Sequence, residues 1–404
     1  MEPRIKESDP EPEPRKKIDL TNTQIAFSHK SDKELKATAK LFKMMNQHWL
    51  VNLGSSMSLL AVKMRLPFFE TIVKSTVFYQ FCGGENLLDC QAAIDKLYQH
   101  DTLTILDYGA EGKTTEKEIE AVVEESIKAL ELAASNDSVP VISCKITAFV
   151  DNDILIKVQE KKELSDAEES SMEKLYDRIS SICSRAHELG VGVFIDAEES
   201  WLQEPIDELV IEMMEKYNKE KVAVYNTYQL YRHDKLAQLK EDHKRAVDGG
   251  YILGAKLVRG AYMEKERARA EEEGYPSPIQ PDKESTDRDF DLAIDYVVHN
   301  YESIASCCAS HNAASNLKQA ELIEKLDIDP KHPHLNFCQL YGMSDFITYN
   351  ISSQGYNVAK YVPYGPVKEV IPYLIRRAQE NTSVTGEMSR ELNFIMKEIK
   401  RRGI

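Results

Sequence analysis

The sequence predicts an α/β protein built on a (β/α)8 barrel, with a helical arm in front of it. From residue 103 onward, eight short runs rich in β-branched residues alternate with charged stretches of helical character, which is the pattern of βα units around a parallel sheet. Eight strands match the count of a closed barrel. The glycine-rich turn of a doubly wound dinucleotide-binding sheet is missing, since Gly190 and Gly192 begin a strand without a third glycine,.

The composition is that of an ordinary soluble protein and argues against broad nucleic-acid binding. The chain has 404 residues, 42% of them apolar and 29% charged, and its 51 basic and 67 acidic side chains give a formal charge of −16. Because excess negative charge works against binding to a polyanion, we expect no nucleic-acid partner. Seven cysteines without a C-x-x-C pair predict reduced thiols and no metal site,.

Three segments follow one another along the chain. Residues 1–20 hold four prolines among alternating charges, so we expect a flexible tail without a signal peptide, and hence a cytoplasmic protein. Residues 21–98 are helical in pattern, rich in Met, Leu and Phe, and locally basic. This N-terminal helical arm either packs onto the neighbouring domain or lies on a membrane surface. Residues 99–404 form the barrel domain.

The predicted strands end on polar residues. The eight runs are LTILDY at 103–108, VPVISCKI at 139–146, VGVFID at 191–196, VAVYNTY at 222–228, ILGAKLV at 252–258, IASCCASH at 304–311, HLNFCQL at 334–340 and YNVAKYV at 356–362. Active sites of this architecture lie at the carboxyl ends of the strands. Strands covered on both faces tolerate few charges, so packing alone does not explain polar residues there. The candidate site residues are therefore Asp107, Lys145, Asp196, Asn226, Gln229, Lys256, Arg259, His311, Gln339 and Tyr361.

Lys145 and the helix after the last strand carry the charges that a small anion needs. Lys145 is flanked by apolar residues in CKIT, and it would serve either as an anion ligand or as a Schiff-base nucleophile. The segment PYLIRRAQEN places four polar residues on one helical face: Tyr373, Arg376, Arg377 and Glu380,. Two arginines there indicate a clamp for a carboxylate or a phosphate.

These motifs resemble those of the proline dehydrogenase family, the flavin enzymes that oxidise L-proline. The resemblance covers roughly residues 100–395 and rests on eight motifs in order: DYGAE at 107–111, CKIT at 144–147, DAEES at 196–200, KLVRGAY at 256–262, ASHN at 309–312, QLYGM at 339–343, KYVPYG at 360–365 and YLIRRAQEN at 373–381. It implies that the barrel is distorted, that it binds FAD without a dinucleotide-binding motif, and that the last helix lies over the barrel mouth.

The family pattern also implies how the substrate is held. Three cations would pair with the substrate carboxylate: Lys145, Arg376 and Arg377. Tyr361 and Leu340 would pack against the pyrrolidine ring, and Asp196 would orient the cations. Glu111 would pair with Arg376 to close the site over the substrate. Tyr373 and Glu380 would stand in this gate or next to it.

The resemblance places FAD over the strand ends. Its isoalloxazine ring would lie with Lys256 near N5 and with His311 and Arg259 around it, while Thr286 would reach the adenine end. The set of residues implied for cofactor contact is Asn226, Gln229, Lys256, Arg259, Ala261, Tyr262, Thr286, His311 and Gln339.

The implied reaction is hydride transfer from C5 of L-proline to N5 of FAD, which gives Δ1-pyrroline-5-carboxylate, with electrons passed on to a membrane quinone. Peripheral contact of the basic arm with the inner face of a membrane, and a partner pyrroline-5-carboxylate dehydrogenase, stay open. We favour proline over hydroxyproline because the bulky Tyr361 leaves little room for a 4-hydroxyl. The alternatives are a hydroxyproline dehydrogenase on the same scaffold and, more remotely, a Schiff-base lyase that uses Lys145.

Overall fold

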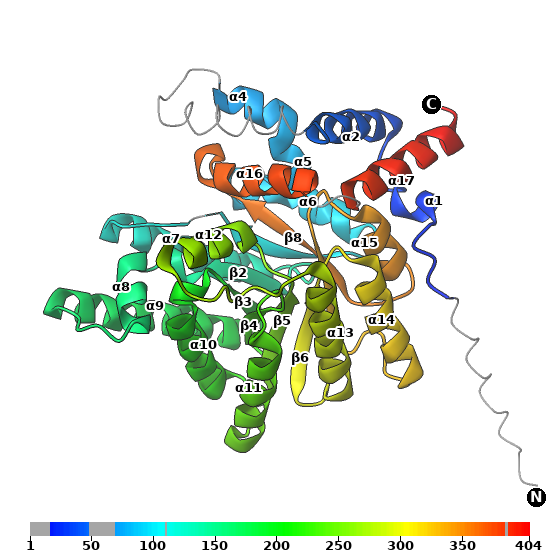
Figure 1. Ribbon diagram of the computed structural model, residues 1–404. Coiled ribbons are helices and arrows are strands. Elements are labelled where there is room, and N and C mark those ends of the chain that lie inside the picture. The colour runs from blue at the N-terminus through cyan, green and yellow to red at the C-terminus, as the bar shows by residue number, and fades with distance from the viewer. Residues whose placement is uncertain (1–16, 48–68, 110, 384–386) are drawn as a thin grey trace, which may run out of the picture.

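Eight parallel strands form a closed barrel, as the sequence predicts (Figure 1). The computed structural model describes residues 17–47, 69–109, 111–383 and 387–404. The strands are β1 (Leu103–Tyr108), β2 (Val141–Lys145), β3 (Gly192–Asp196), β4 (Val224–Gln229), β5 (Leu253–Val258), β6 (Ile304–Ala309), β7 (Leu335–Leu340) and β8 (Val358–Tyr364). Every predicted strand end lies within two residues of the observed one. Pairing of β1 with β8 closes the barrel.

Alternate residues of the strands fill the inside of the barrel, because successive side chains of a strand point to opposite faces. The middle layer contains Ile105, Phe194, Tyr225, Ala305, Cys307, Cys338 and Ala359. Gly254 makes room for this layer, since a Cβ atom at that position would lie 3.0 Å from Cγ of Tyr225 and 2.1 Å from the carbonyl oxygen of Val224. The layer is a packed floor beneath the polar residues at the carboxyl ends of the strands.

Helices surround the barrel, and Asn312, just after β6, caps one of them. The surrounding helices are α7 (Glu116–Ala134), α8 (Asn152–Gln159), α9 (Asp166–Leu189), α10 (Gln203–Tyr217), α11 (Lys235–Gly249), α12 (Met263–Glu273), α13 (Lys283–His299), α14 (Ala313–Lys325) and α15 (Asp345–Ser352), with short turns η2 (Ile146–Ala148) and η3 (Ser200–Leu202). Asn312 accepts hydrogen bonds from the first amides of α14, which fixes the turn that carries His311.

The arm packs against the barrel along its described part, and its exposed face includes the basic residues Lys40 and Lys43. Its elements are α1 (Thr23–Ala26), α2 (Asp32–Met45), α4 (Phe69–Val73), η1 (Lys74–Phe78), α5 (Tyr79–Phe81) and α6 (Leu87–Tyr98). Phe27, Phe42 and Phe78 are buried in the same apolar core as Tyr364 at the end of β8. Most of the predicted tail and the stretch 48–68 of the arm lie outside the described residues.

Helix α16 (Val367–Ser383) lies between the strand ends and helices α2 and α4 (Figure 1). This is the helix that the sequence places over the barrel mouth. It is not the last one: α17 (Glu387–Arg402) follows and packs against α1, α2 and α15. Among the described residues, no helix combines the length and the apolar character needed to cross a bilayer.

Candidate active site

Five polar side chains from five strands meet inside the carboxyl end of the barrel. They are Asp107 of β1, Lys145 of β2, Asp196 of β3, Lys256 of β5 and Tyr361 of β8, and we call them the inner ring. Asp196 is their hub. Its carboxylate lies 2.5 Å from Nζ of Lys256 and 3.4 Å from Nζ of Lys145, and it accepts a hydrogen bond of 2.6 Å from the Tyr361 hydroxyl.

The inner ring holds its central ion pair in the charged state. Burial disfavours the charge of Asp196, but Lys256 and Lys145 outweigh burial and hold the pKa of Asp196 well below its usual value,. Burial likewise disfavours the charge of Lys145, yet three nearby carboxylates raise its pKa well above the usual value,. Lys145 is therefore an ammonium ion at neutral pH, which suits an anion ligand and not a free amine nucleophile.

Asp107 differs from Asp196 because it has weaker partners. Its Oδ1 lies 3.8 Å from Nζ of Lys145 and has no hydrogen-bond partner among the described residues. Burial raises the pKa of Asp107 to about 6, against the attraction of Lys145,. The inner ring thus holds one firmly ionised carboxylate and one that takes up a proton in mildly acidic solution.

Aromatic and aliphatic side chains stand beside these charges. Nζ of Lys256 lies 4.7 Å from the ring centre of Tyr361 and 5.2 Å from that of Phe194, distances at which the ring faces attract a cation. Leu340, at the end of β7, packs against the same cluster as Tyr361. The predicted pair of ring-packing residues therefore lies together at the barrel mouth.

Helix α16 brings two arginines to this mouth. Arg376 donates two hydrogen bonds, of 2.6 and 3.2 Å, to the Glu111 carboxylate that follows β1. Glu111 also lies 3.9 Å from Nζ of Lys145. Burial opposes ionisation of Glu111, but Lys145 and Arg376 lower its pKa,. Arg376 therefore pairs with Glu111, as predicted, and the pair ties α16 to the loop after β1.

Arg377 and Tyr373 lie one turn apart on the same helix. The buried Arg377 guanidinium lies 5.2 Å from the ring centre of Tyr373, which orients it by a cation–π contact. Glu380 belongs to α16 as well, but its side chain lies outside the described residues.

The ends of β5 and β6 carry a second polar group. Arg259 donates to Ser310 (2.6 Å) and Ser315 (3.0 Å) and pairs with Asp287 (2.7 Å), so its planar guanidinium is fixed. His311 contacts the Ser344 hydroxyl through Nδ1 at 2.8 Å. Burial lowers the pKa of His311 to about 3,, and the imidazole is neutral near pH 7.

The loop after β5 also carries the predicted residues Ala261 and Tyr262. Ala261 is exposed and Tyr262 is buried. Gly260 before them has φ of +137°, and a Cβ atom there would lie 2.4 Å from the Tyr231 ring, so only glycine fits. Thr286 is buried on α13, where its hydroxyl donates to the Asp282 carbonyl at 3.3 Å.

Three predicted residues are engaged outside the inner ring. Asn226 donates to Asp207 of α10 at 2.9 Å, and Gln339 contacts Asn316 and Thr348 on α14 and α15. Both are fully buried on the helix side of the barrel wall. Gln229 donates to the Glu198 carbonyl at 2.7 Å. The structure does not bring Asn226 and Gln339 to the residues around Asp196.

Sequence reasoning left out residues that support the inner ring. Ser143 donates to Asp196 at 2.9 Å, and the signal for it was available, because it precedes Lys145 by two positions on the same strand face. Glu198 is buried and accepts two hydrogen bonds from Thr147, of 3.0 and 2.8 Å. Burial raises the pKa of Glu198 to about 7,. It holds the turn that follows Lys145.

Comparison with known proteins points to the same family as the sequence motifs. Residues 90–390 match the sequence model of the family described as proline dehydrogenase. Proline dehydrogenase 1, mitochondrial, of Dictyostelium discoideum is 31% identical over 431 residues, which cover 96% of this chain and 75% of the relative. The hydroxyproline dehydrogenase of Xenopus laevis is 32% identical over 415 residues, covering 93% and 88%.

A solved structure shares the fold. The crystal structure of proline utilization A from Bdellovibrio bacteriovorus, inactivated by N-propargylglycine, superposes with a TM-score of 0.75 at 22% identity. The match covers 92% of this chain but only 42% of that much longer protein.

Proposed function

Because this chain belongs to the proline dehydrogenase family, we propose that it oxidises L-proline to Δ1-pyrroline-5-carboxylate with bound FAD. The observation that carries the proposal is the charge balance at the barrel mouth. Four cations stand there: Lys145, Lys256, Arg376 and Arg377. Three carboxylates offset them: Asp107, Asp196 and Glu111. Among the side chains that the structure describes in this group, one positive charge is left over, which one substrate carboxylate neutralises.

Each residue has a defined part in binding proline. Lys145 and the two arginines of α16 bind the carboxylate, and the guanidinium forks fix its orientation. Tyr361 and Leu340 cover the pyrrolidine ring and exclude water. The pair of Glu111 with Arg376 holds α16 over the bound substrate, which keeps the reacting carbon in place.

The same cations favour the reactive form of the amine. An ammonium group next to several positive charges loses its proton more easily, because like-charge repulsion lowers its pKa. The neutral amine has a lone pair that assists departure of the hydride from C5. Asp196 limits this effect, because its charge keeps Lys145 and Lys256 paired within the inner ring.

The donors at the ends of β5 and β6 fit a flavin. Bound FAD would supply a hydride acceptor, which no side chain provides. Arg259 presents a fixed cation, His311 a neutral imidazole and Lys256 a buried ammonium, a set suited to phosphate oxygens and to the polar edge of an isoalloxazine ring. Ala261, Tyr262, Thr286 and Gln229 complete the proposed contact set.

Hydroxyproline oxidation is the second candidate, because one relative is a hydroxyproline dehydrogenase. The Tyr361 ring is fully inside the barrel, and its hydroxyl is tied to Asp196 at 2.6 Å. A phenol held this way has little freedom to make space for a 4-hydroxyl group, so proline is the better substrate. Replacement of Tyr361 by Ala should narrow the difference in activity between proline and hydroxyproline.

Trapping of the product separates oxidation from Schiff-base chemistry. Incubation with L-proline and a soluble quinone should yield a cyclic imine that condenses with o-aminobenzaldehyde, and it should leave the protein mass unchanged after borohydride treatment. A protein that makes no imine from L-proline, but that borohydride links through Lys145 to a carbonyl substrate, would instead be a lyase.

For the electron acceptor we propose a membrane quinone, reached through peripheral contact of the basic arm with the bilayer. Such contact is compatible with a protein otherwise free in the cytoplasm. A pyrroline-5-carboxylate dehydrogenase is the proposed consumer of the product.

A further inference from the structure

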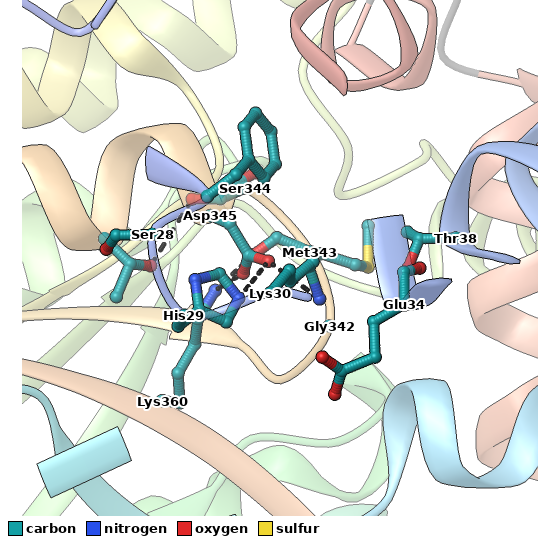
Figure 2. A network of polar contacts seen from close by, with 12 residues as sticks. Ser28, His29, Lys30, Glu34, Thr38, Gly342, Met343, Ser344, Asp345 and Lys360 are labelled. Carbon is teal, nitrogen blue, oxygen red and sulfur yellow. Dashed lines mark hydrogen bonds and ion pairs between the residues drawn. The ribbon is translucent and has the colours of Figure 1, made fainter. Parts of the chain in front are cut away.

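A buried ion cluster outside the barrel wall joins three distant parts of the chain (Figure 2). Its centre is Asp345, the first residue of α15. Oδ1 of Asp345 lies 2.9 Å from Nζ of Lys360, while Oδ2 lies 3.2 Å from Nε2 of His29 and 3.4 Å from Nζ of Lys30. The side chains of Asp345 and His29 are each only 5% exposed, and those of Lys360 and Lys30 are 1% and 12% exposed.

The side-chain partners of Asp345 come from β8 and from the turn after α1, and helix α17 holds that turn. His29 and Lys30 form the turn after α1, and the His29 ring stacks on Tyr349 of α15 with centres 4.1 Å apart. From α17, Arg402 donates to the carbonyls of Phe27 and Lys30, each at 2.8 Å. Because buried charges are costly without partners, this cluster fixes where the turn sits against the barrel.

The cluster also fixes the loop between β7 and α15. Lys360 donates to the carbonyls of Met343 and Leu340. Gly342 has φ of +75°, and a Cβ atom there would meet the Gln80 carbonyl oxygen at 1.8 Å. Ser344 has φ of +51°, a left-handed conformation that is unfavourable for a residue with a Cβ atom and persists only where its surroundings impose it.

Two neighbours of the cluster reach the active site. Ser344, next to Asp345, holds Nδ1 of His311 at 2.8 Å. Lys360 is next to Tyr361, whose side chain points to the opposite face of β8 and donates to Asp196,. Asp345 is therefore the sequence neighbour of Ser344, which contacts His311, and the ion-pair partner of Lys360, which is the sequence neighbour of Tyr361.

We propose that Asp345 is a positioning residue, which sets His311 and Tyr361 through Ser344 and Lys360, and that His29 and Lys30 make this arrangement depend on the docked N-terminal segment. The part that concerns FAD and proline rests on the proposed function. The positioning of the loop 340–345 does not depend on it.

The test uses the edge of the cluster, where a variant should still fold. Lys30→Met keeps the apolar stem and removes the charge. Lys96→Met is the matched control, because it breaks the neighbouring but half-exposed ion pair with Glu34 (2.6 Å), which does not touch Asp345. Lys30→Arg restores a cation and should behave as the parent protein.

Two measurements are made on each full-length protein: hydrogen exchange without ligand, and the dissociation constant of FAD. We expect Lys30→Met to speed exchange in peptides that cover 340–346 and 309–314 and to raise the dissociation constant of FAD about fivefold. The control should do neither. Ser344→Ala should raise the FAD constant to a similar degree without loosening the turn 27–30.

The results separate the two proposals. Exchange in Lys30→Met equal to that of Lys96→Met would overturn the proposed dependence of the loop 340–345 on the docked N-terminal segment. Faster exchange with unchanged FAD binding, in Lys30→Met or in Ser344→Ala, would overturn the link from the cluster to His311. A parent protein that binds no FAD would refute the proposed function, and hydrogen exchange alone would then decide the role of Asp345.

Discussion

Asp196 is the residue on which the geometry of the site depends most. Its carboxylate is shared by two buried lysines and the Tyr361 hydroxyl. We expect Asp196→Asn to lower the free energy of unfolding by about 3 kcal/mol, because two buried ammonium groups lose their main counter-charge. Proline oxidation should be lost as well. Urea unfolding at neutral pH measures the first effect.

A second variant serves as the control for the stability loss in Asp196→Asn. Glu208→Gln breaks the ion pair with Arg245 (3.1 Å), in which the Arg245 and Glu208 side chains are 42% and 73% exposed, so the cost should stay below about 1 kcal/mol. Equal losses in the two variants would contradict the central position of Asp196.

The raised pKa of Asp107 makes us expect that ligand binding depends on pH. Its raised pKa of about 6 means that it gains a proton as the pH falls through this value, and the mouth then carries one more positive charge. The affinity for a carboxylate without an amine, such as cyclopentanecarboxylate, should rise a few-fold between about pH 7 and pH 5.5. Perturbation of the flavin spectrum reports the binding. Affinity that does not change through pH 6, or a step that survives in Asp107→Asn, would refute this assignment.

Residue identities were predictable where the two-residue period of a strand decided them. Lys145, Asp196, Lys256 and Tyr361 were selected at strand ends, and all four lie in the inner ring. Asn226 and Gln339 were selected by the same rule but face the helices, because a shift of one residue turns a side chain to the other side of the wall. The exact end of a strand cannot be read from one sequence, so one sequence does not decide which face of the barrel wall a residue at that end occupies.

At the scale of elements, the gate formed by α16 and the loop after β1 is the part that should control substrate binding. Two neighbouring ion pairs join them: Arg376 with Glu111, and Lys113 with Glu369 (2.6 Å). Glu111→Ala should raise KM for proline roughly tenfold, because Arg376 loses the bidentate partner that orients it, while kcat should change less.

The ion pair of Lys113 with Glu369 provides the control for Glu111→Ala. Lys113→Met also removes a contact between the loop and α16, but it leaves Arg376 oriented, so KM should stay near that of the parent enzyme. If both variants raise KM equally, Glu111 acts only by anchoring the helix.

The strands were readable from the sequence, while the docking of the outer helices was not. The eight strands carry their own signal, since β-branched runs alternate with charged helices. Helix α17 was not foreseen, because its burial depends on contacts with residues more than 350 positions away, such as those of Arg402 with Phe27 and Lys30.

For the whole molecule, the proposed membrane contact of the arm makes a clear prediction. Lys40 and Lys43 are exposed on α2, on the side of the molecule that carries α16 (Figure 1). Reversal of both to Glu should weaken flotation with anionic vesicles at least about tenfold, since each basic residue near such a surface contributes about 1 kcal/mol. Activity with a soluble quinone should be unchanged.

The control is the same double reversal on the far side of the barrel. Lys240 and Lys244 are exposed on α11, which lies away from α2 (Figure 1), and their reversal should leave flotation as it is. Equal behaviour of the two double variants would show that net charge, and not the arm, sets vesicle binding.

The most direct test of the whole account is the visible spectrum of the purified protein under anaerobic conditions, with L-proline and then trans-4-hydroxy-L-proline added. We expect the absorption bands of an oxidised flavin, which bleach with L-proline and hardly change with hydroxyproline. A protein that cannot be reconstituted with FAD, or whose flavin is not reduced by L-proline, would contradict it.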